Sequence, residues 1–101
     1  MCSLTRNNGS FNAPTGSNVT VKVVAHATTL VVAEYNDAST SVNANAVTFA
    51  VVAGDAELFL TLAGPQDNVQ IVEDCGAGNT QVLYSYSNDF HPILGFKITG
   101  V

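Results

Sequence analysis

The chain has 101 residues, of which 47% are apolar and 11% charged, and its formal net charge is −5. A chain of this length forms one domain around a single core. Its only basic residues are Arg6, Lys22 and Lys97, whereas proteins that bind nucleic acid or anionic membranes need clustered cations. No apolar run approaches the roughly 20 residues of a membrane span. We therefore expect neither a nucleic-acid partner nor a membrane partner.

The first part of the chain, residues 1–18, is rich in the Asn, Gly, Pro and Ser residues that form turns. We expect an irregular N-terminal arm there, with one short strand near residues 10–12, followed by a single domain over residues 19–101. Residues 1–15 are polar and lack the hydrophobic core of a signal peptide. The chain is thus interpreted either as cytosolic or as a mature or excised piece with an added Met1.

From residue 19 on, apolar and polar residues alternate in short runs separated by turn-forming residues. Successive side chains of a strand point to opposite faces, so this pattern predicts an all-β, antiparallel β-sandwich, Ig-like or jelly-roll-like, with about seven strands. The expected strands are 19–24, 30–35, 46–53, 57–63, 69–73, 80–86 and 94–98. Residues 36–45 are expected to form a polar loop.

Two apolar runs in the middle of the chain, 46–53 and 57–63, flank Gly54-Asp55-Ala56, a composition typical of a tight connection. We interpret them as a hairpin of two adjacent antiparallel strands. The alternative is a helix over residues 42–53, because alanine is a strong helix former. The β-branched residues of this run and the glycine at its end favour the strand.

Such a sandwich has few lysines or inward-facing charges with which to protect the edges of its sheets. This favours self-association or binding to another protein. The leading hypothesis is a non-catalytic binding or assembly module, extracellular or on the surface of a particle. A secreted or cell-surface location is expected, and a cytoplasmic one stays open.

The two cysteines, Cys2 and Cys75, leave three readings open. In an oxidising compartment they would pair and close a long loop, which stabilises the fold by about 4 kcal/mol if the effect is entropic. The position of Cys2 beside the terminus instead favours free or intermolecular thiols. Cys2 is also where a trimmed lipoprotein carries its lipid, although no lipobox precedes it.

The sequence offers little for catalysis. A small hydrolase that uses His91 with Asp89 is the enzymatic alternative, and the other histidine, His26, is expected at a strand end. Asp55 and Glu57 are two positions apart and share a face only where the backbone is regular, so we interpret them as a solvated hairpin tip rather than as an acid–base pair. The protein is therefore not expected to be an enzyme.

The best cluster for a ligand lies near the C-terminus. Two tyrosines share one face of an expected strand, and a loop with polar and aromatic side chains follows; the candidate binding residues are Tyr84, Tyr86, Asn88, Asp89, Phe90 and His91. Aromatic faces stack on sugar rings while amides and carboxylates take hydroxyl hydrogen bonds, so a glycan is the expected ligand. The alternative is that the tyrosines pack in the core.

Three expected loops carry an Asp beside an Asn, and Asp37, Asp67 and Asp89 are the candidate metal ligands. Calcium prefers carboxylate and amide oxygens, so a calcium-assisted carbohydrate-binding domain is one alternative, and ordinary turns are the other. No Cys-x-x-Cys or His-Glu-x-x-His spacing occurs, and no zinc or other cofactor is expected.

Overall fold

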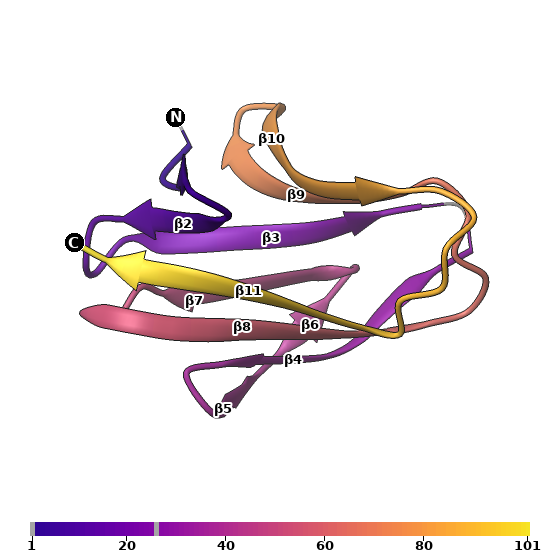
Figure 1. Ribbon diagram of the computed structural model, residues 1–101, viewed down its shortest axis with the longest axis horizontal. Coiled ribbons are helices and arrows are strands. Elements are labelled where there is room, and N and C mark those ends of the chain that lie inside the picture. Colours follow the sequence, from indigo (N-terminus) through magenta and orange to yellow (C-terminus); the bar gives the residue numbers. More distant parts are fainter. Residues whose placement is uncertain (1, 26) are drawn as a thin grey trace.

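The computed structural model describes residues 2–25 and 27–101, so the expectations for Met1 and His26 lie outside the described residues. Within these two ranges the chain forms eleven strands in two sheets that pack together (Figure 1). The predicted all-β sandwich is therefore confirmed, with more strands than the seven expected. No helix of the described part is long and apolar enough to cross a membrane.

Sheet A has six strands and sheet B has five. In spatial order, sheet A contains β1 (Thr5–Asn7), β2 (Ser10–Ala13), β11 (Ile93–Gly100), β8 (Gly54–Ala63), β4 (Thr29–Tyr35) and β5 (Ala38–Thr40). Sheet B contains β10 (Asn79–Tyr86), β9 (Val69–Gly76), β3 (Asn18–Val24), β7 (Ala46–Ala50) and β6 (Val42–Asn43). The named strands pair antiparallel except for β2 and β11, which are parallel.

The core lies between the sheets and follows the period-two pattern of the sequence. In β8 the residues Leu58, Leu60 and Leu62 are buried, while their neighbours in sequence point outward or lie partly exposed. Each large apolar side chain moved from water into such a core stabilises the fold by about 1.5–3 kcal/mol. The largest fully buried apolar side chains are Val19, Val21, Val47, Leu58, Leu60, Val69, Ile71 and Ile98.

The predicted hairpin across Gly54-Asp55-Ala56 is wrong. β7 belongs to sheet B and β8 to sheet A, so the chain crosses from one sheet to the other through residues 51–53. The backbone N–H of Val51 donates to the Ser17 carbonyl (2.9 Å), and that of Val52 donates to the Tyr35 hydroxyl (3.1 Å). Alternation shows which side chains face the core, but both inner faces of a sandwich carry the same pattern.

Several short strands occupy segments that were expected to be irregular. In the N-terminal arm the short strand expected near residues 10–12 is present as β2, whose Phe11 is buried in the core, whereas β1 was not expected. The polar loop over residues 36–45 contains β5 and β6. Asn36 and Asp37, at the β4–β5 turn, both have positive φ (53° and 62°), the backbone of a type I′ hairpin turn. This turn is tight, and it brings the side chains of Asn36 and Asp37 close to the outward-facing residues of β8.

A β-bulge in β4 changes the predicted faces of that strand. Its register shifts between Leu30 and Val32, so the buried residues after the shift are Ala33 and Tyr35 rather than Val32 and Glu34. The expectation that Leu30, Val32 and Glu34 share one face is therefore wrong, because a bulge adds one residue to the strand. As a result Glu34 points outward, directly opposite Phe59 of β8.

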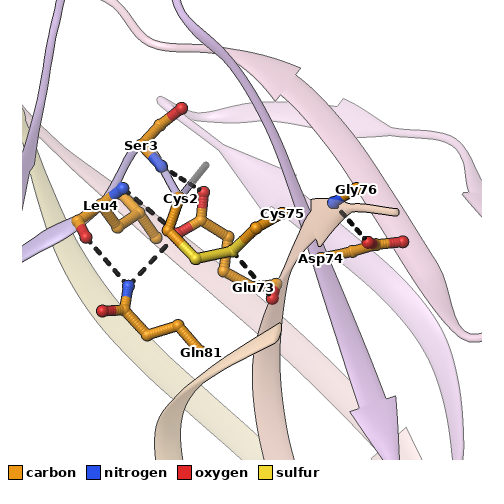
Figure 2. Close-up of a disulfide and its surroundings, with 8 residues drawn as sticks. All are labelled: Cys2, Ser3, Leu4, Glu73, Asp74, Cys75, Gly76 and Gln81. Atoms are coloured by element: carbon orange, nitrogen blue, oxygen red, sulfur yellow. Dashed lines mark hydrogen bonds between the residues drawn. A yellow bond between two sulfur atoms is a disulfide. The ribbon is translucent and has the colours of Figure 1, made fainter. Parts of the chain in front are cut away.

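The N-terminal residues are fixed to sheet B by a covalent bond and by a buried carboxylate (Figure 2). Cys2 and Cys75 form a disulfide that spans 73 positions of the sequence. Beneath it Glu73, which is 2% exposed, accepts hydrogen bonds from the backbone N–H groups of Ser3 (2.9 Å) and Leu4 (3.2 Å) and from the Gln81 amide (3.2 Å). Of the three readings of the cysteines, the structure shows the intramolecular pair.

Candidate functional site: a groove on the outer face of sheet A

A groove of about 580 Å³ lies where the β4–β5 turn meets β8 and β11. The outward-facing residues of β8 form its centre, because Asp55, Glu57 and Phe59 alternate with the buried Ala56 and Leu58. The turn and β11 add further polar groups. The groove is lined by Asn36, Asp37, Asp55, Ala56, Glu57, Phe59 and Lys97. Its volume lies in the range of small-molecule sites.

Phe59 provides the apolar surface of the groove. It is 40% exposed, and it lies opposite Gly95 of β11 in the sheet. A Cβ added at Gly95 would lie only 3.0 Å from Cε1 and 3.2 Å from Cδ1 of the Phe59 ring. The ring therefore leans over the glycine and packs against the β11 backbone, so Gly95 provides the space for this position of the ring.

Asp55 is held as an anion at one end of the groove. The Thr99 hydroxyl donates a hydrogen bond to Asp55 Oδ1 (2.8 Å), and Lys97 Nζ lies 3.3 Å from Asp55 Oδ2. The Thr99 hydrogen bond first, and then the hydrogen bond and charge of Lys97, lower the pKa of Asp55 below its ordinary value of 3.8. Both members of this ion pair are exposed, so it adds little to stability and mainly orients the two side chains.

The remaining charges of the groove are negative. Lys97 is the cation that lines the groove, and it is paired with Asp55. Asp37 and Glu57 also line the groove, and Glu34 lies opposite Phe59 on β4. The exposed aromatic ring therefore has carboxylates on its own strand, on the neighbouring strand and at the adjacent turn.

The structure brings part of the sequence-predicted ligand cluster together at another place. The rings of Tyr84 and Tyr86 lie 5.6 Å apart, and the His91 ring lies 4.7 Å from that of Tyr86. Tyr86 is buried, and its hydroxyl donates to the Gln66 side chain, which also accepts the His91 N–H (2.9 Å). This half of the cluster packs the end of the sandwich.

The other members of that cluster lie in the loop between β10 and β11 (Figure 1). Asn88, Asp89 and Phe90 are exposed, and Phe90 is 70% exposed. Tyr84 stays 38% exposed at the edge strand β10. A ligand site here stays a prediction, and a hollow of about 210 Å³ beside it includes Tyr86 and Ser87 in its lining.

The buried Tyr86 phenol leads to a prediction about alkaline pH. Burial, with a smaller effect of Tyr84, raises the pKa of Tyr86 above its ordinary value of 10.0. The folded state thus holds this proton more tightly than the unfolded chain, so the stabilisation is complete below pH 10.0 and is lost as the pH rises through the raised value. We expect the difference in unfolding free energy between wild type and Tyr86→Phe to shrink above pH 10.0 in urea titrations; a constant difference would contradict this account.

The three aspartates predicted as metal ligands lie in three different loops. Asp37 is at the β4–β5 turn, whereas Asp67 and Asp89 lie in the β8–β9 and β10–β11 loops at the other end of the sandwich (Figure 1). Among the described residues, one group of at least three His, Cys, Asp and Glu side chains has its ligand atoms within 4.8 Å, and it comprises Cys2, Glu73 and Cys75. Its two sulfurs form the disulfide. The structure thus does not bring the three aspartates together.

Sequence reasoning missed most of the groove. Asp37 was assigned to a metal site, Asp55 and Glu57 to a hairpin tip, and Asn36, Phe59 and Lys97 to no site. The alternation of residues in β8 could have identified part of it. If Leu58 and Leu60 face the core, then Glu57 and Phe59 must face outward. Parity alone does not mark Phe59 as part of a site, because single exposed apolar residues are common on protein surfaces; the groove around it becomes visible once the strand order is known.

Comparisons with known protein families, with curated proteins and with solved structures find no match for this chain.

Proposed function

We propose that this protein is a non-catalytic carbohydrate-binding module whose ligand occupies the groove on sheet A. The observation that carries the proposal is the exposed Phe59 ring at the centre of a groove lined with carboxylates, an amide and an ammonium group. Sugars present an apolar C–H face and a rim of hydroxyls, so they need an aromatic surface surrounded by polar groups. The groove has both.

The volume of the groove supports a small or linear ligand rather than a folded protein surface. A groove of about 580 Å³ falls within the usual range for small-molecule sites, roughly 300–1,000 Å³. Its polar side chains come from a tight turn and two central strands of sheet A, which are positions that a packed sandwich holds firmly.

The disulfide supports a location outside the reducing cytoplasm. Structural disulfides form and persist mainly in secreted and cell-surface proteins. The Cys2–Cys75 pair therefore favours a secreted or cell-surface module, in which a carbohydrate ligand is readily encountered.

Calorimetric titration with a panel of oligosaccharides tests the proposal. Phe59→Ala removes the aromatic surface and is expected to weaken binding at least tenfold, about 1.4 kcal/mol or more, because stacking on the ring is lost. Phe90→Ala is the matched control, since it removes an exposed phenylalanine from the β10–β11 loop. If Phe90→Ala weakens binding and Phe59→Ala does not, the ligand site is the sequence-predicted loop. A chelator arm of the same titration measures any dependence on calcium.

A second candidate function is self-association through β10. This edge strand of sheet B is eight residues long and contains no charged residue and no proline. Arg6 donates to the Leu83 carbonyl (2.9 Å) and so occupies part of its polar backbone. We expect Arg6→Ala to increase self-association in light scattering at high protein concentration. A variant that stays monomeric at every concentration would exclude β10 as an assembly edge.

A further inference from the structure

We infer that the groove prefers sugars that carry a free amine, such as glucosamine units, over neutral sugars of the same linkage. This inference rests on the proposed function and names the ligand class of the same groove. The groove and its exposed Phe59 ring define the site. The charged side chains around the ring then determine which sugars bind best.

The charge balance around Phe59 favours a cation. Lys97 lies directly opposite Glu57 in the sheet, and its ammonium group forms an ion pair with Asp55 (3.3 Å). Three carboxylates, those of Asp37, Asp55 and Glu57, thus line the groove with one cation. The protein as a whole has a net charge of −5, which adds a weak long-range attraction for cationic ligands. A neutral sugar donates hydroxyl hydrogen bonds to these carboxylates, whereas an ammonium group gains hydrogen bonds and charge attraction together.

The arrangement of the strands places two carboxylates, those of Glu34 and Glu57, close to a sugar ring stacked on Phe59. Glu34 lies directly opposite Phe59 on β4, and such pairs have Cβ atoms about 4.5–5.5 Å apart. Glu57 lies two positions before Phe59 on the same face of β8, which is about 7 Å along the strand. A sugar ring over Phe59 that bears an ammonium group thus has Glu57 nearby on the same strand, inside the groove, and Glu34 on the neighbouring strand, beside it.

The aromatic ring adds to the same preference. A cation within about 6 Å of an aromatic face is attracted by the ring quadrupole, by about 0.5–1 kcal/mol at exposed sites. Because Phe59 is exposed, this attraction and that of the neighbouring carboxylates act on the same ammonium group of the ligand. Hydroxyl groups receive no comparable attraction from the face of the ring.

The test compares three β-1,4-linked hexasaccharides by calorimetry: one of glucosamine, one of N-acetylglucosamine and one of glucose. At mildly acidic pH and low salt, where the amines are charged, we expect the glucosamine hexamer to bind about tenfold more tightly than the glucose hexamer. The advantage is expected to shrink as salt screens the charges. The N-acetylglucosamine hexamer, which has no charge, is expected to bind like the glucose hexamer.

Two variants that each remove one negative charge distinguish a preference that arises in the groove from one that arises from the net charge of the protein. Glu57→Gln is expected to reduce the affinity for the glucosamine hexamer by a larger factor than the affinity for the glucose hexamer, because both lose a hydrogen-bond acceptor and only the glucosamine hexamer also loses a charge interaction. Asp67→Asn, in the β8–β9 loop at the other end of the sandwich, is the matched control and is expected to change neither.

Each failure has a separate meaning. If the glucose hexamer binds as tightly as the glucosamine hexamer, the amine preference is wrong and the proposed function stands. If Asp67→Asn weakens glucosamine binding as much as Glu57→Gln does, the preference arises from the net charge and the inference is also wrong. If none of the three hexamers binds, the inference fails, and the same absence across a wider oligosaccharide panel rejects the proposed function.

Discussion

Replacing both cysteines by serine is expected to lower the free energy of unfolding by about 4 kcal/mol. The Cys2–Cys75 disulfide closes a loop that spans 73 positions of the 101-residue chain, and it thereby restricts the unfolded state strongly. Small domains are stabilised by about 5–15 kcal/mol in total, so the variant loses a large share. Urea unfolding of wild type and Cys2→Ser/Cys75→Ser measures the difference.

Reduction of the wild-type protein provides the control for this prediction. Under a reducing agent, wild type is expected to unfold at the same urea concentration as the double variant, because both then lack the same bond. A loss below about 1 kcal/mol for the double variant would show that the N-terminal arm is held mainly by its other contacts.

Replacing Glu73 by alanine is expected to destabilise the fold by about 3 kcal/mol. The carboxylate is 2% exposed and accepts hydrogen bonds from Ser3, Leu4 and the Gln81 side chain. Without the carboxylate, the Ser3 N–H, the Leu4 N–H and the Gln81 amide each lose a hydrogen-bond acceptor where the N-terminal arm meets sheet B. Thermal or urea unfolding measures the effect.

Asp74→Ala, one position along β9, is the matched control for Glu73→Ala. It removes the ion pair with Lys22 (3.1 Å) and a hydrogen bond from the Gly76 N–H (3.0 Å), both at the surface, and is expected to have a much smaller effect. Equal losses for the two variants would contradict a special role for Glu73. Because Glu73 and the disulfide fix the same arm, their effects are also expected to be non-additive in a double-mutant cycle.

The architecture was predictable from the sequence to the extent that it depends on local alternation. The pattern in residues such as Leu58 and Leu60 identifies the inner face of a strand because the side-chain period is two. The same pattern does not identify the partner strand, so β7 and β8 were placed in one hairpin although they lie in different sheets. The bulge in β4 likewise has no signature that alternation alone reveals.

The groove was harder to predict because it depends on contacts between distant segments. It needs the tight turn at Asn36 and Asp37 to approach β8, and it needs Gly95 of β11 opposite Phe59. Neither pairing can be read before the strand order is known. The predicted cluster around Tyr84 used only neighbours in sequence, and the structure brings Tyr84, Tyr86 and His91 together there.

Amide chemical-shift mapping during titration with the glucosamine hexamer tests the central claim most directly. We expect the largest shifts at the groove, at Asn36, Phe59 and Lys97, and we expect them to disappear in Phe59→Ala. The loop that carries Asn88 and Phe90 is expected to stay unchanged. Shifts confined to that loop, or a titration to high concentration that moves no amide of the groove, would contradict the account.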